Sequence, residues 1–284
     1  MIKQFPRTVV GGVSMPRIIM GTNWLLGYSH TGAAADKGIL EKYQKPEDFY
    51  PVIAAYLDYG IDAIMGPVST NQLALDAINY AQEKSGQKLI IVDTPAMNVS
   101  DSAEARAEAK AVIKRSADIG STFCLIHHTS AEQLVNKNLQ NMTRLPDYLA
   151  MIRDVGLLPG LSAHMPELVT YSDANGYDVE TYIQIFNCMN FLMQVEVESV
   201  ARIIRNAKHP VMTIKPMAAG RTTPFVGLNF NWAVLRDCDM ITVGAGSEAE
   251  AREDIEISFA ALERRAPDLA ARSSPFKQSI LGHK

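Results

Sequence analysis

Short apolar runs of strand length alternate with longer amphipathic segments along the whole chain, and this alternation constrains the fold more than any other feature. The predicted strands cover residues 17–20, 61–65, 88–92, 122–126, 157–161, 182–186, 211–214 and 240–243. The predicted helices cover residues 46–59, 71–85, 102–119, 145–155, 197–206, 225–235 and 248–262, and the chain from 25 to 45 is predicted to be a polar loop. No low-complexity linker interrupts the pattern, so we expect one domain.

Strands that are separated by helices pair in parallel through right-handed crossovers, and eight such strands are the number that closes a barrel. We therefore predict an α/β fold of the (β/α)8 or TIM-barrel type over residues 1–284, with residues 264–284 as a C-terminal surface tail. An open, doubly wound sheet is the alternative. It is disfavoured because the first strand-to-helix turn lacks the G-x-G-x-x-G pattern of dinucleotide-binding sheets.

Charge and composition restrict the partners of the chain. The net charge of −4 lacks the basic surplus that binding to nucleic-acid phosphates requires, and no stretch is apolar for long enough to cross a membrane. The three cysteines are widely spaced and form no metal or redox motif, which is typical of a cytoplasmic protein. We expect a small-molecule substrate, and the alanine-rich helix 102–119 is compatible with a homo-oligomer.

Four ionisable side chains follow predicted strands at the barrel end where such enzymes carry their active sites. Asp93, His127, His164 and Lys215 follow the third, fourth, fifth and seventh strands, and we predict them as the catalytic residues. His127 and His128 are adjacent on one strand, so at most one of them is expected to face the opening. Asp93 and His164 also suit helix capping, and that structural interpretation stays open.

The same opening is expected to hold the substrate-binding residues, predicted as Asn23, Trp24, His30, His128 and Arg221. Arg221 lies in the loop after the seventh strand, where barrels often bind anionic groups. Because the third, fourth and fifth strands are neighbours, an alternative role for Asp93, His127 and His164 is to bind a divalent metal as two imidazoles and one carboxylate.

Several strand-end segments resemble those of the aldo-keto reductase superfamily, in the same order along the chain. The matching segments are 15–22, 125–127, 160–167, 183–187, 215–220 and 243–254. The resemblance implies a barrel that binds a nicotinamide cofactor. It implies that Ser162, Gln184, Gly244, Gly246 and Ser247 are the cofactor-binding residues.

The departures from that family concern its catalytic residues. The family protonates a carbonyl oxygen with a tyrosine tuned by lysine, aspartate and histidine, while NAD(P)H supplies hydride. Here Met65 stands at the aspartate position, Asp93 at the lysine position, and no tyrosine follows before Tyr80, so only His127 matches. Glu248 and Glu250 stand where NADP-preferring members carry basic residues, which favours NAD over NADP.

Three functions are compatible with this sequence. The leading hypothesis is an aldo-keto-reductase-like barrel that has lost hydride transfer and performs lyase or isomerase chemistry, with or without a metal, on a small sugar-like or hydroxy/keto-acid substrate of carbohydrate metabolism. The first alternative is an NAD(H)-dependent oxidoreductase with a replaced proton donor. The second alternative is a non-catalytic binding or assembly subunit.

Overall fold

The computed structural model describes residues 2–269, and eight parallel strands close a barrel within them. The barrel strands are β3 (Ile18–Gly21), β4 (Ala63–Gly66), β5 (Ile90–Asp93), β6 (Phe123–Ile126), β9 (Leu158–Ala163), β10 (Thr181–Ile185), β11 (Val211–Ile214) and β12 (Met240–Val243). They pair in that order, and β12 returns to β3. The predicted (β/α)8 barrel is confirmed, and each strand lies within a few residues of its expected bounds.

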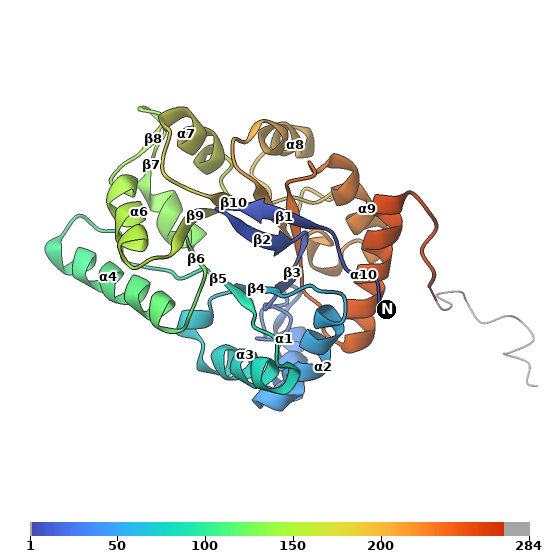
Figure 1. Cartoon of the computed structure of the whole chain (residues 1–284). Helices are drawn as coiled ribbons and strands as arrows, with labels where there is room; N and C mark the ends of the chain where they lie inside the picture. Colours follow the sequence, from blue (N-terminus) through green and yellow to red (C-terminus); the bar gives the residue numbers. More distant parts are fainter. Residues whose placement is uncertain (1, 270–284) are drawn as a thin grey trace, which may run out of the picture.

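Helices surround the barrel (Figure 1). The longer ones are α2 (Pro46–Leu57), α3 (Gln72–Ser85), α4 (Ala103–Asp118), α6 (Leu145–Asp154), α7 (Glu167–Asn175), α8 (Val197–Asn206), α9 (Pro224–Val234) and α10 (Glu248–Glu263). Side-chain oxygens of Asn71, Ser102, Thr223 and Ser247 accept hydrogen bonds from backbone N–H groups at the starts of α3, α4, α9 and α10. The predicted helices therefore form where local capping and periodicity agree.

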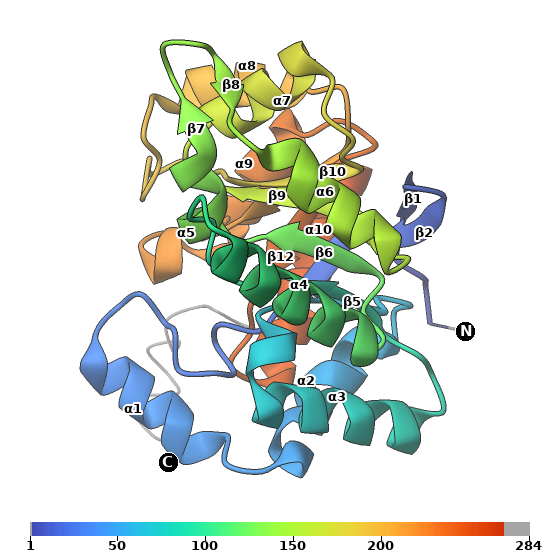
Figure 2. The same ribbon diagram turned by 90° about the vertical axis from the view of Figure 1, so that its left-hand side faces the viewer.

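Three of the longer elements were absent from the sequence prediction: the helix α7, which follows β9, and two elements at opposite ends of the barrel. The hairpin β1 (Arg7–Val10) and β2 (Val13–Pro16) turns through two glycines with positive φ and buries Val10 and Met15 among the inner side chains of the barrel. The segment predicted to be a polar loop contains α1 (Ala33–Lys42), which the pattern missed because Ile39 is its single buried residue. Figure 2 shows α1 at the end of the barrel opposite this hairpin.

Short elements complete the end of the barrel that carries α1. They are η1 (Val68–Thr70), α5 (His128–Ala131), η2 (Glu132–Leu134), η3 (Ala218–Gly220) and the two-residue strands β7 (Val135–Asn136) and β8 (Asn141–Met142). All of them follow barrel strands, so they lie where strand ends open toward the candidate site.

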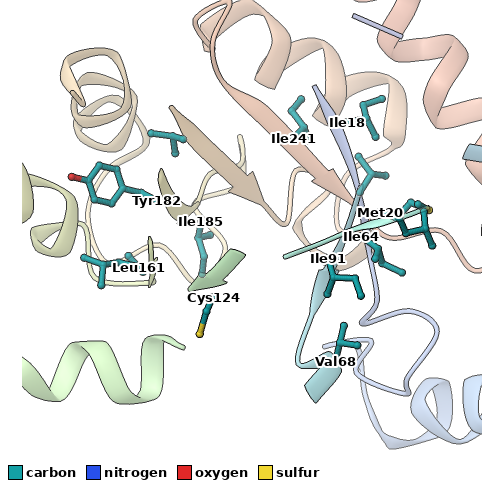
Figure 3. Packing of buried hydrophobic residues seen from close by; sticks show 14 of the residues in the cluster. Ile18, Met20, Ile64, Val68, Ile91, Cys124, Leu161, Tyr182, Ile185 and Ile241 are labelled. Carbon is teal, nitrogen blue, oxygen red and sulfur yellow. The ribbon is translucent and has the colours of Figure 1, made fainter. Parts of the chain in front are cut away.

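Both faces of the barrel sheet are buried, which produces two layers of apolar packing. Ile19, Val92, Leu125, Ile183 and Met212 belong to the inner layer. Figure 3 shows part of the outer layer, in which side chains such as Ile64, Ile91 and Cys124 point from the strands toward the helices. This alternation decides which strand-end side chains reach the interior.

The C-terminal part of the described chain follows α10. The Arg265 guanidinium binds the Glu256 carboxylate, and the Asp268 backbone N–H donates to the same carboxylate. Most of the tail predicted for residues 264–284 lies outside the described residues. No helix within residues 2–269 combines the length and the apolar character that crossing a membrane requires.

Candidate active site

A large cavity opens at the C-terminal ends of the barrel strands. Its volume is about 1250 Å³, which exceeds the roughly 300–1,000 Å³ typical of small-molecule sites. Ten of the residues predicted from the sequence line it: Asn23, Trp24, His30, His127, His128, Ser162, His164, Lys215, Arg221 and Gly244. The lining residues follow seven different strands, β3, β4, β5, β6, β9, β11 and β12, so these loops converge on one space, as the barrel topology requires.

Asp93 does not reach this cavity, and its predicted place at the opening is wrong. Val92 points into the barrel, so the next side chain along β5 points outward, while Thr94 lines the cavity. The Asp93 side chain is fully buried, and its Oδ1 accepts a hydrogen bond from the Ser69 backbone N–H at 3.1 Å. Burial raises the pKa of this carboxyl group. Asp93 supports the short helix η1 and has no access to a substrate.

The predicted metal site therefore lacks its carboxylate ligand. Asp93 faces the helices while His127 and His164 face the cavity, so the three side chains do not converge. Across residues 2–269, no group of three or more His, Cys, Asp or Glu side chains has an arrangement that suits a metal ion. The geometry of the protein thus gives no support to the metal-assisted alternative.

His127 and His128 both line the cavity, contrary to the expectation that at most one would do so. The strand β6 ends at Ile126, His127 caps the following turn, and His128 begins α5, so strand alternation no longer applies to this pair. The His128 ring stacks on the His164 ring, with 3.7 Å between centroids, and lies 4.3 Å from the His127 ring. Three imidazoles from two loops consequently form one cluster.

Burial keeps these imidazoles uncharged near neutral pH. Burial first, and then the neighbouring His128, lowers the pKa of His127 to about 4. Burial, His128 and Lys215 lower the pKa of His164 to about 3. Because each ring is neutral at pH 7, each offers one N–H donor and one nitrogen lone pair.

The hydrogen bonds of His127 determine which nitrogen carries the proton. Its Nδ1 lies 2.8 Å from the Thr129 hydroxyl and accepts a 3.4 Å hydrogen bond from the Thr129 backbone N–H. A backbone N–H can only donate, so Nδ1 is the acceptor and Nε2 carries the hydrogen. The neutral His127 ring therefore has a donor available for a substrate oxygen.

Glu132 organises the histidine cluster and was missed by the sequence analysis. Its Oε1 accepts hydrogen bonds from the backbone N–H groups of His164 and Met165, at 2.8 and 2.9 Å, and lies 3.9 Å from Nδ1 of His128. Its position four residues after His128 in the sequence would have identified it as a partner if that segment had been predicted as helical.

Lys215 and His30 meet across the cavity. Lys215 Nζ lies 2.9 Å from His30 Nε2, and His30 Nδ1 lies 2.9 Å from the Tyr28 carbonyl oxygen. The carbonyl can only accept, so His30 Nδ1 carries the hydrogen and Nε2 accepts from the ammonium group. Burial lowers the pKa of Lys215 to about 8, and no carboxylate among the described residues forms an ion pair with it.

Arg221 provides a second cationic group in the cavity wall. Its guanidinium carbon lies 3.9 Å from the centre of the Phe191 ring, and Nη1 donates to the Ala218 carbonyl at 3.2 Å. The remaining N–H groups of this planar donor suit a carboxylate or phosphate. Three acidic residues, Glu250, Glu253 and Asp254, also line the cavity, so its charge is mixed.

The residues predicted to bind a cofactor are only partly brought together. Ser162 and Gly244 line the cavity, but Gln184 is fully buried outside it, with Ile183 lining the wall instead. The Gln184 side-chain amide donates to the Ile185 carbonyl at 3.3 Å. Gly246 and Ser247 do not line the cavity either, and Ser247 caps α10 by accepting from the Glu250 N–H.

The start of α10 does not fit the phosphate of a dinucleotide. Its backbone N–H groups would attract an anion, but the Glu250 carboxylate already accepts from the Gly246 N–H at 2.7 Å. Glu253 and Asp254 add carboxylates to the same part of the cavity. A phosphate placed there would meet like charge, so this part of the cavity does not suit a dinucleotide.

Comparisons with known proteins show what the whole chain resembles. No protein-family model and no curated protein match the sequence. Among solved structures, a protein from Pseudomonas aeruginosa assigned to the aldo-keto reductases is similar with a TM-score of 0.65 and 14% identity, over 92% of this chain and 98% of its own. A thermostable aldo-keto reductase in complex with the inhibitor epalrestat is similar with a TM-score of 0.59 and 13% identity, over 92% and 98%.

Aldose reductase from Giardia lamblia shares the fold as well, with a TM-score of 0.52 and 13% identity over 89% of each chain. Likeness at such low identity establishes the fold and not the activity. The resemblance to aldo-keto reductases is thus confirmed for the architecture of the chain.

Proposed function

We propose that this chain is an enzyme that moves protons at a carbon next to a carbonyl group, as a lyase or an isomerase. The observation that carries this proposal is the sharing of one cavity wall by the neutral imidazoles of His127 and His164 and the amine of Lys215. Removal of such a proton needs a base, and the resulting enolate needs a donor or a positive charge near its oxygen.

His127 is the donor to the substrate oxygen. Its Nδ1 is occupied by Thr129, so Nε2–H is the group that it presents. A neutral imidazole donor can polarise a carbonyl without first transferring its proton.

His164 is the base. Its ring stacks on His128, and the contacts of its backbone N–H with Glu132 fix the loop that carries it. Burial, His128 and Lys215 keep the ring unprotonated, so its lone pair is available at neutral pH. An anionic substrate would offset the positive charge of Lys215 and make His164 a stronger base once the substrate is bound.

The substrate that suits this wall is a small keto acid, hydroxy acid or sugar-like acid. Arg221 supplies planar donors for its carboxylate, and Lys215 supplies positive charge for the carbonyl or enolate oxygen. Met65 lines the cavity where the sequence resemblance places an aspartate, and its sulfur accepts a hydrogen bond from Thr242. A thioether cannot supply the charge of a carboxylate, which supports chemistry other than the family's usual hydride transfer.

Proton exchange in D2O tests this proposal directly. The protein is incubated with pyruvate, 2-oxobutyrate and dihydroxyacetone, and NMR follows the loss of hydrogen next to each carbonyl. We expect exchange with at least one probe, and a decrease of about a hundredfold in His164→Ala and His127→Ala. His209→Ala, an imidazole outside the cavity wall, is the matched control. Exchange that is absent with all probes, or unchanged in both variants, refutes the proposal.

The cavity volume favours one second candidate, an NAD(H)-dependent oxidoreductase. The space is larger than a small keto acid needs, and Ser162 and Gly244 lie on its wall. Fluorescence titration with NADH and NADPH tests it: micromolar affinity supports this alternative, whereas no binding at millimolar concentration rejects it.

A further inference from the structure

We propose that Lys215 is a nucleophile that forms an imine with the carbonyl carbon of its substrate, and that His30 receives the proton released by the Lys215 ammonium group. The inference rests on the proposed function in assuming a carbonyl substrate in this cavity. It adds a covalent intermediate, in which an iminium group replaces simple electrostatic stabilisation of the enolate.

The hydrogen-bond chain from Tyr28 to Lys215 supplies the proton acceptor. The Tyr28 carbonyl fixes the hydrogen of His30 on Nδ1, so the lone pair of Nε2 points at Lys215 Nζ, 2.9 Å away. A proton can therefore pass from the ammonium group to the imidazole without movement of either side chain. This contact joins the loop after β3 to the end of β11, two segments about 185 residues apart in sequence.

Both residues have a backbone conformation that is uncommon for side chains with a Cβ atom. His30 and Lys215 each have φ of 59°, in the left-handed region. Ile214 already lines the cavity, and the left-handed turn allows the next side chain, Lys215, to line it too. Such conformations are energetically unfavourable for residues with a Cβ atom and are concentrated at functional sites.

The surroundings of Lys215 favour a neutral amine. The basic groups around it are His30, His128, His164 and Arg221. Carboxylates face the same neighbours: Asp36 acts on His30, Glu132 lies 3.9 Å from His128 Nδ1, and Glu250, Glu253 and Asp254 line the cavity. Burial lowers its pKa to about 8, so roughly one molecule in ten carries the free amine at pH 7. An ordinary lysine with a pKa of 10.5 has roughly three hundred times less free amine at that pH.

The reaction balances without any further reagent. The ammonium group gives one proton to His30, and the nitrogen lone pair attacks the carbonyl carbon, forming the C–N bond. His30 then returns its proton to the carbonyl oxygen, a second proton passes from the Lys215 nitrogen to that oxygen, and the C–O bond breaks with loss of water. The product is a protonated imine, so ammonium plus carbonyl gives iminium plus water. The iminium then accepts the electron pair when His164 removes the neighbouring proton.

Reductive trapping with glyoxylate tests the imine. Glyoxylate is an aldehyde with a carboxylate for Arg221, and sodium cyanoborohydride reduces its imine to a stable carboxymethyl-lysine that peptide mass spectrometry locates. At pH 7 and substoichiometric labelling, we expect Lys215 to be modified at least a hundredfold faster than the exposed Lys110, the internal control. The His30→Ala variant should lose most of this selectivity, while His164→Ala should keep it.

The outcomes separate this inference from the proposed function. Labelling at Lys215 no faster than at Lys110 overturns the imine. Labelling that is unaffected by His30→Ala overturns the role of His30. Reductive trapping does not require catalytic turnover, so it tests the imine independently of the proton-exchange assay. If the protein catalyses proton exchange in D2O but Lys215 is not trapped, the acid–base function stands and only the covalent intermediate is refuted.

Discussion

Replacing Lys215 with methionine should make the protein more stable at neutral pH, although it removes a residue of the candidate active site. The fall in pKa from 10.5 to about 8 means that keeping the buried ammonium group charged at pH 7 costs the folded state roughly 3 kcal/mol. Methionine has a similar shape and no charge, but it loses the hydrogen bond to His30, which is worth about 1 kcal/mol. The free energy of unfolding should therefore increase by about 2 kcal/mol.

The pH dependence follows from the direction of this pKa change. Below pH 8 the Lys215 ammonium group is charged in both the folded and the unfolded chain, so the folded state carries the full free-energy cost of burying that charge. Between pH 8 and 10.5 the folded chain has released the proton while the unfolded chain keeps it, so the stability of the wild type rises relative to Lys215→Met. The advantage of the variant should fall to about zero near pH 10.

Urea denaturation followed by tryptophan fluorescence at pH 7, 8.5 and 10 measures both effects. Lys110→Met, the same substitution on the exposed face of α4, is the control and should show no such pH dependence. A Lys215→Met variant that is less stable than the wild type at pH 7, or a difference that stays constant up to pH 10, would refute the reasoning.

Four further predictions concern catalysis and the scaffold. Because burial, His128 and Lys215 lower the pKa of the base His164 to about 3, the acidic decline of the proton-exchange rate should lie below pH 5, and a midpoint near 6.5 would contradict this. Asp93→Asn should leave that rate within about twofold of the wild type. It should gain stability relative to the wild type as pH rises above 3.8, since burial raises the pKa of Asp93 and opposes its ionisation in the fold. Asp239→Ala should lower the free energy of unfolding by about 3–5 kcal/mol, because this fully buried carboxylate pairs with a guanidinium and accepts a backbone N–H from β11. Gly160→Ala should lower the free energy of unfolding, measured by urea denaturation, by about 1–3 kcal/mol, since the added Cβ would lie 2.7 Å from the Thr181 carbonyl oxygen.

The barrel was predictable because its strands and helices are each encoded locally. Helices such as α3 and α4 have an apolar stripe and a capping side chain, and glycines follow their ends. The helix α1 was not predicted because Ile39 is its single buried residue, so its sequence shows no apolar stripe. The hairpin β1–β2 was not predicted because its stability comes from a tertiary contact: it closes one end of the barrel and packs against the inner side chains there.

The sequence also identified the end of the barrel that carries the cavity and ten of its lining residues, since every parallel strand ends at the same side of the barrel. It did not fix the direction of individual side chains. Barrel strands are apolar on both faces, so the period of two that separates Val92 from Asp93 is hidden in the sequence. Asp93 was therefore predicted on the wrong face.

At the ends of the strands, local backbone conformation determines which side chains enter the cavity, because the alternation of side chains along a strand no longer applies there. His127 and His128 share the cavity because a helical turn begins between them, and Lys215 enters it through a left-handed residue. The pairing of Lys215 with His30 joins segments far apart in the chain. The sequence thus determined the barrel and the end that carries the candidate site. Only the tertiary structure decided which charged groups meet there, because their proximity depends on closure of the barrel and on the path of its loops.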